Sequence, residues 1–134
     1  MKKIVLISCV SQKRSHRSKA KDLYISALFK KNLAYARRLN PDAIYILSAK
    51  YGLVDLETEI DPYNQTLNTM PAAEIRSWAD RLVQQLRQVT DVHQDHFIFL
   101  AGMKYRKYLL PHLASYEIPL EGLTIGKQLQ ALSR

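Results

Sequence analysis

The chain has 134 residues, a length typical of one domain, and we expect residues 1–134 to form a single domain. Its 47% apolar and 24% charged residues exclude a disordered chain, a collagen and a coiled coil. Lysine and arginine outnumber aspartate and glutamate by 20 to 12, and the resulting net charge of +8 favours anionic partners.

The apolar stretch near the N-terminus is short. It covers residues 4–7, whereas a membrane span needs about 18 apolar residues and a secretory signal about 7–15. We therefore expect no membrane partner and a cytoplasmic location, in which the single cysteine, Cys9, stays reduced.

Three apolar runs predict the strands of a sheet, at residues 3–10, 43–49 and 96–101. Nearly continuous apolar residues are typical of parallel strands that are covered on both faces. Apolar residues at helical spacing predict helices at residues 25–39 and 71–89. We also expect a short helix at residues 105–113, which stops near Pro111, and a helix at residues 124–132. A last edge strand is expected at residues 118–120, where Pro119 is tolerated. Because strands alternate with helices, the predicted fold is α/β: a single three-layer α/β/α domain with a short, mainly parallel sheet.

Polar residues follow each predicted strand. Ligands of open α/β sheets bind beyond the carboxyl ends of the strands, so these residues are the candidate substrate-binding residues. They are Ser8, Cys9, Lys13, Lys50, Tyr51, Gly102 and Tyr105. Gly126 lies in a glycine-bearing approach to the last helix, where backbone amides could hold an anion. The alternative is a glycine-capped tight turn, and the spacing is neither a Walker loop nor a dinucleotide fingerprint.

Asp61 is the candidate catalytic residue. It lies in a connection of about twenty residues before Pro71, and ordered connections of that length are usually functional. If this connection folds over the strand ends, the carboxylate could orient a water or stabilise a cationic, sugar-like transition state. Alternatively, Asp61 caps a turn or pairs with cations of the N-terminal segment.

Four tyrosines lie near the suspected edge of the sheet: Tyr24, Tyr51, Tyr63 and Tyr105. A tyrosine ring can stack on a nucleic-acid base while its hydroxyl fixes the orientation. The alternative for each tyrosine is a half-buried core residue. Together they predict an aromatic-lined pocket for substrate.

Cys9 has two interpretations. It is a nucleophile if Lys13 or His16 favours its thiolate, or it is a buried structural cysteine. The histidines lack zinc-type spacing with the cysteine, and we expect neither a metal nor another cofactor.

Basic residues concentrate at positions 13–21. The candidate nucleic-acid contacts there are Lys13, Arg14, Arg17, Lys19 and Lys21. Ammonium and guanidinium groups interleaved with hydroxyls suit phosphate oxygens, and such a loop could hold a strand while a base enters a neighbouring pocket. The alternative is a solvated loop without a partner.

Several motifs resemble those of an uncharacterised bacterial and phage domain family of unknown function. They are Ser8-Cys9 with Lys13, Ser48-Ala49-Lys50-Tyr51-Gly52-Leu53, Pro62-Tyr63 with Thr66-Leu67, and Pro119-Leu120 with Gly122 and Ile125-Gly126. Ser8-Cys9 and Ser15-His16-Arg17 are also similar to a domain of archaeal archaeosine-synthesis enzymes. That domain and the peroxide-stress protein family resemble uracil-DNA glycosylases, which implies a related fold here.

These observations lead to three hypotheses. The first is an enzyme that processes a nucleoside or nucleic-acid base, by hydrolysing or exchanging an N-glycosidic bond. The second is a module that binds nucleic acid or a nucleotide without changing it. The third is a small-molecule hydrolase that uses Cys9.

Overall fold

A five-stranded sheet forms the centre of the computed structural model, which describes residues 1–8 and 12–133. The strand order is β4-β3-β1-β6-β7. All three predicted strands are confirmed within the described residues. The strands are β1 (Lys3–Ser8), β3 (Ala43–Ser48), β4 (Gly52–Asp55), β6 (His96–Leu100) and β7 (Ser115–Glu117).

The sheet is mainly parallel, as predicted. β1 lies parallel to β3 and β6, with Leu6 paired to Tyr45 on one side and to Phe99 on the other. β7 continues the parallel arrangement beyond β6, and β4 alone runs antiparallel, beside β3. The carboxyl ends of β1, β3 and β6 therefore lie at the same edge of the sheet.

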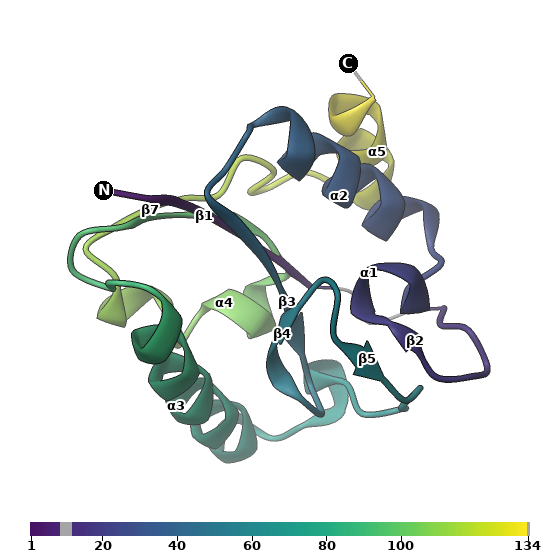
Figure 1. Ribbon diagram of the computed structural model, residues 1–134, viewed down its shortest axis with the longest axis horizontal. Coiled ribbons are helices and arrows are strands. Elements are labelled where there is room, and N and C mark those ends of the chain that lie inside the picture. Colours follow the sequence, from purple (N-terminus) through teal and green to yellow (C-terminus); the bar gives the residue numbers. More distant parts are fainter. Residues whose placement is uncertain (9–11, 134) are drawn as a thin grey trace.

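Helices cover both faces of the sheet (Figure 1). α2 (Ala27–Arg38) and α5 (Ile125–Leu132) pack together on one face, and α3 (Ala72–Val89) and α4 (Met103–Arg106) lie on the other. Because both faces are covered, Val5, Leu6 and Phe99 are fully buried. The three-layer α/β/α fold is thereby confirmed. None of the described helices has the length and apolar character needed to cross a bilayer.

A smaller unit lies beside the carboxyl edge of the sheet. It contains α1 (Ala20–Leu23) and the antiparallel pair β2 (Ser18–Lys19) and β5 (Glu59–Ile60). The segment after β5 leads through a 3-10 turn, η1 (Leu67–Thr69), to α3. The long connection predicted before Pro71 is thus ordered by short elements.

Two predicted elements are wrong in detail. The helix expected at residues 105–113 is divided into α4 and a 3-10 turn, η2 (Leu110–His112), because Pro111 has no N–H to continue an α-helix. The edge strand expected at residues 118–120 lies earlier, at β7. Residues 118–121 instead form a turn closed by a hydrogen bond from the Glu121 N–H to the Ile118 carbonyl at 3.1 Å.

Candidate functional site

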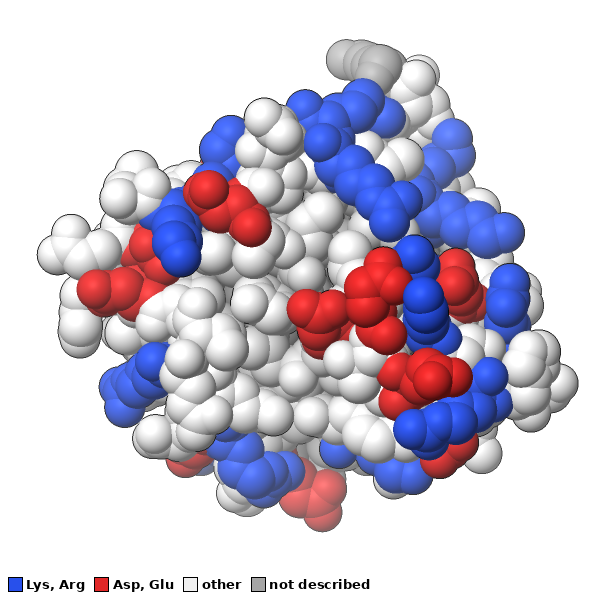
Figure 2. Space-filling model, in the orientation of Figure 1, with Lys and Arg blue, Asp and Glu red and all other residues white. Residues whose placement is uncertain are grey.

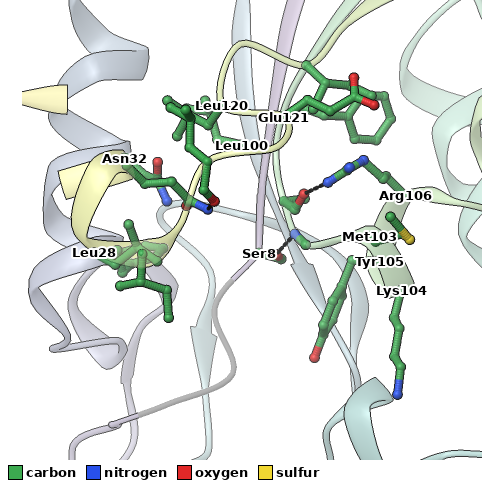
Figure 3. A pocket seen from close by; sticks show the side chains of 18 of the residues that line it. Ser8, Leu28, Asn32, Leu100, Met103, Lys104, Tyr105, Arg106, Leu120 and Glu121 are labelled. Carbon is green, nitrogen blue, oxygen red and sulfur yellow. Dashed lines mark hydrogen bonds between the residues drawn. The ribbon is translucent and has the colours of Figure 1, made fainter. Parts of the chain in front are cut away.

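A pocket of about 560 Å³ opens at the carboxyl ends of β1 and β6. Its walls come from β1, α2, α4, the segment after β7 and the start of α5. Figure 3 shows Asn32 and Leu28 on one side of the pocket and Tyr105, Lys104 and Arg106 on the other. The pocket therefore lies where ligands of open α/β sheets bind.

Ser8 joins the ends of two neighbouring strands. Its Oγ accepts a hydrogen bond of 3.1 Å from the Gly102 N–H, which begins α4 directly after β6. Both residues line the pocket, as the position of polar residues after the strands predicts. The bond fixes the floor of the pocket between β1 and β6.

Tyr105 forms a buried part of the wall. Its hydroxyl accepts a hydrogen bond from the Leu67 N–H at 3.3 Å, and its ring meets the Trp78 ring edge-on at 5.6 Å. The residue is only 3% exposed. Tyr105 thus lines the pocket as predicted, while its ring also packs in the core.

Two cations line the same side of the pocket as Tyr105. Lys104 donates to the Asn68 carbonyl at 3.0 Å, and Arg106 donates to the Ala101 carbonyl at 2.8 Å. Because each group retains further N–H donors, both can also meet an anion. Among the described residues of the lining, Glu121 is the one that carries a carboxylate. None of these three residues was among the candidates predicted from the sequence.

Asn32 was also missed. It projects from α2 into the lining of the pocket and is 3% exposed, yet its side-chain oxygen has no hydrogen-bond partner among the described residues. A polar residue at this point of the apolar stripe, between Phe29, Leu33 and Ala36, was the available signal. Buried acceptors without partners are rare and costly, so this oxygen marks the pocket as a place for a donor.

Three predicted tyrosines form a cluster beside the pocket. The hydroxyls of Tyr24 and Tyr63 are 2.5 Å apart, and the Tyr51 ring meets the Tyr63 ring edge-on at 5.8 Å. The Lys13 ammonium lies 4.5 Å from the centre of the Tyr63 ring. Tyr24 also contacts Phe29, which lines the pocket, at 5.1 Å between ring centres. These residues therefore support the pocket from outside and do not line it.

Asp61 lies beyond this cluster, at the surface. Its carboxylate pairs with Arg17 at 3.2 Å, and both side chains are more than half exposed. Its backbone N–H donates to the Tyr51 hydroxyl at 3.2 Å. The structure thus matches the alternative in which Asp61 pairs with a cation of the N-terminal segment, and the carboxylate does not line the pocket.

The basic run at residues 13–21 is largely paired. Besides the Arg17 pair, Lys19 and Lys21 both contact Glu57, at 3.1 and 2.9 Å. Hydrogen bonds from these lysines hold the pKa of Glu57 below its ordinary value, and the same contact raises the pKa of Lys19. Arg14 is exposed. In Figure 2 acidic and basic side chains are interleaved over β2 and β5.

The remaining candidates have separate environments. Lys50 is exposed, with its ammonium 5.3 Å from the centre of the Tyr51 ring. Gly126 is the second residue of α5 and does not line the pocket, although Ile125 and Gln128 do.

Cys9 lies outside the described residues, so its two interpretations stay open. Among residues 1–8 and 12–133, no three histidine, cysteine or acidic side chains are placed to share a metal ion.

A family model covers almost the whole chain. It describes a family of unknown function, DUF6884, and matches residues 4–134. No curated protein and no solved structure gives a significant match. The predicted relation to a family of unknown function is thereby confirmed. The resemblances to archaeosine-synthesis enzymes, the peroxide-stress protein family and uracil-DNA glycosylases stay predictions. The chain therefore belongs to the family of unknown function DUF6884.

Proposed function

We propose that the protein binds a nucleoside or nucleotide in the pocket at the ends of β1 and β6. The volume of about 560 Å³ is in the range of small-molecule sites, which are mostly apolar with a few fixed polar groups. The observation that carries the proposal is the buried, unpartnered oxygen of Asn32.

The chemistry of Asn32 suits the edge of a base. An asparagine amide offers one acceptor and two donors in a plane, and it can bond both the amino group and a ring nitrogen of adenine. Leaving a buried acceptor unpaired costs about 1–3 kcal/mol, which a donor from the ligand would recover. The ligand is therefore expected to present an N–H to Asn32.

The opposite side of the pocket suits a phosphate. Lys104 and Arg106 face the pocket from α4, across from Asn32 (Figure 3). Arginine and lysine bind phosphate oxygens through charge-assisted hydrogen bonds. A base at Asn32 and a phosphate at the α4 side would place the sugar over the floor at Ser8.

Replacement of Asn32 tests the proposal. Isothermal titration calorimetry with the common nucleosides and their 5′-monophosphates measures binding to the wild type, Asn32→Leu and Asn32→Ala. We expect binding of at least one amino-bearing ligand, and about tenfold or weaker affinity in Asn32→Leu, because one buried hydrogen bond of about 1.4 kcal/mol is lost. Gln84→Leu, at an exposed position of α3, is the matched control and should bind like the wild type.

The same variants give a second readout. Because Asn32→Leu removes an unpaired acceptor from the interior, its free energy of unfolding should equal or exceed that of the wild type. Folded Asn32→Leu with undiminished affinity would contradict the role of Asn32. A wild type that binds no member of the panel at millimolar concentration would contradict the proposed function itself.

A second candidate function is hydrolysis of the N-glycosidic bond of the bound nucleoside. It is favoured by Glu121, whose carboxylate-bearing side chain lines the same pocket. In this reaction a water adds to the C1′ carbon of the sugar while the bond from C1′ to the base nitrogen breaks. The electron pair leaves with the base, and the proton taken from the water by Glu121 passes to the departing base.

Two variants distinguish whether Glu121 or Asp61 is the catalytic carboxylate. Release of free base, measured by liquid chromatography, should fall about 100-fold or more in Glu121→Gln, while ligand affinity stays within a few fold. Asp61→Asn is the matched control, because Asp61 lies outside the lining and pairs with Arg17. Loss of turnover in Asp61→Asn alone would overturn the role of Glu121 in favour of the carboxylate expected from the sequence. No base release by the wild type would contradict hydrolysis and leave binding as the function.

A further inference from the structure

The outward side of α2 carries a second concentration of charge. The twelve residues of the helix include four cations and no acidic residue. The cations are Lys30, Lys31, Arg37 and Arg38. We call these four side chains the cationic face. Ala27 and Ala34 are exposed on the same side, and the half-buried Tyr35 lies at its edge.

Helical geometry places the four cations on one side. Lys30 and Arg37 are seven residues apart, as are Lys31 and Arg38, which is about 10.5 Å along the axis in each case. Phe29, which is buried, lies on the opposite side of the helix. The apolar side of α2 is thus used in the core, and the cationic face is directed to solvent.

Contacts with α5 hold half of this face in place. Lys31 donates to the Ser133 hydroxyl at 2.5 Å, and Arg38 donates to the Leu132 carbonyl at 2.9 Å. The Arg38 guanidinium also lies 5.7 Å from the centre of the Tyr35 ring. Lys30 and Arg37 make neither a hydrogen bond nor an ion pair through their side chains with any described residue.

We propose that the cationic face of α2 binds the phosphate backbone of a nucleic acid. The contrast with the basic run at residues 13–21, which we call the basic loop, supports this choice. Arg17, Lys19 and Lys21 are paired with Asp61 and Glu57, whereas no carboxylate among the described residues pairs with the cationic face. In Figure 2 the basic side chains over α2 form a continuous area, and those lower on the same side alternate with acidic ones.

The chemistry of the face favours nucleic acid over other polyanionic surfaces. A helix that binds a membrane surface inserts an apolar face between the headgroups, and the apolar side of α2 is occupied by the core. A stable protein interface needs aromatic or other apolar anchors at its centre, whereas the exposed residues between the cations of α2 are alanines and the Tyr35 ring is half-buried at the edge of the face. Phosphate backbones are bound by cations without such anchors.

This surface is separate from the pocket. Asn32 points to the inside of α2, and the cationic face lies on the outside of the same helix. The inference therefore goes beyond the proposed binding of a nucleoside, and each can fail without the other.

The experiment compares two double variants that remove the same charge. Lys30→Ala with Arg37→Ala removes the two unpaired cations of α2, and Arg17→Ala with Lys19→Ala removes two paired cations of the loop. Biolayer interferometry measures binding of each variant and of the wild type to a 20-nucleotide single strand and to a 20-base-pair duplex between 50 and 300 mM salt. Circular dichroism confirms that each variant is folded.

We expect the α2 variant to lose affinity about tenfold or more for at least one of these DNA probes. For the duplex, the slope of log affinity against log salt should become shallower by about 1.8, since each phosphate contact contributes about 0.9. The loop variant should stay within about twofold of the wild type. Nucleoside affinity in the pocket should be unchanged in both, which separates this proposal from the preceding one.

Three outcomes would overturn the inference. Equal losses in both variants would mean that net charge alone attracts DNA, and a loss confined to the loop variant would assign binding to residues 13–21. Binding to vesicles with 30% phosphatidylserine, without binding to either DNA probe, would identify a membrane surface as the partner.

Discussion

Asn32 combines a cost in stability with a use in recognition. A leucine at this position would complete the apolar stripe of α2, yet the chain carries an amide whose oxygen is buried without a partner. An arrangement of this kind is expected where a ligand supplies the missing donor. The residue is therefore informative in two measurements at once, because affinity and stability should respond to its replacement in opposite directions.

Gly52 is a second position where we expect a single substitution to change the stability of the fold. Its φ is +75°, and a Cβ there would clash with the Gln85 Oε1, which accepts a hydrogen bond from the Leu53 N–H at 2.9 Å. We expect Gly52→Ala to lower the free energy of unfolding by about 1–3 kcal/mol, through backbone strain and loss of this hydrogen bond. Urea unfolding followed by circular dichroism measures the effect.

Gly126 provides the matched control for Gly52. It lies in α5, and a Cβ there would meet no atom within 4 Å. Since alanine favours helix more than glycine does, Gly126→Ala should leave stability unchanged or raise it by about 0.5–1 kcal/mol. Equal destabilisation in the two variants would contradict the argument from φ and contact.

At the scale of elements, the sequence predicts the buried strands and long helices well. β1, β3 and β6 are nearly continuous in apolar residues because both faces of the sheet are covered, and this pattern depends little on distant contacts. β4 was missed because it has four residues and contains Gly52 and Asp55, so it carries no comparable pattern. It is a strand only because it returns beside β3 after a tight turn.

The candidate site likewise contains residues that the sequence predicts and residues that it does not. Ser8, Gly102 and Tyr105 are predictable, because residues after parallel strands meet at one edge of the sheet whatever the details of packing. The pairing of Asp61 with Arg17 joins residues 44 positions apart and could not be read from spacing. Asn32 lies within α2 and not after a strand, so the rule that ligands bind beyond the strand ends does not select it.

At the scale of the whole molecule, the N-terminal end of β1 is tied to the loop before β6. The Asp95 carboxylate accepts the Lys2 N–H at 2.9 Å and the Asp91 N–H at 2.8 Å. The hydrogen bond from Asp91 is the main cause that lowers the pKa of Asp95 below its ordinary value, and the bond from Lys2 adds to it. One buried side chain thus joins segments 93 positions apart.

This tie predicts a dependence of stability on pH. Because the folded pKa is lowered, the contribution of Asp95 is complete above its ordinary pKa of 3.8 and declines as the pH falls from there through the folded pKa. We expect Asp95→Asn to be less stable than the wild type by about 1–2 kcal/mol at pH 7, with a smaller difference at pH 2. Thermal unfolding across this range measures it. Asp80→Asn, at an exposed position of α3, is the control, and an Asp95→Asn difference that does not shrink in acid would contradict the assignment.

Trp78 gives the fold a practical property. It is the single tryptophan of the chain, its indole N–H donates to the Ser48 carbonyl at 2.9 Å, and its ring touches Tyr105. Because Tyr105 lines the pocket, one aromatic ring separates the indole from any occupant. Ultraviolet emission from a single, well-defined chromophore thus provides a built-in gauge of occupancy that needs no added dye.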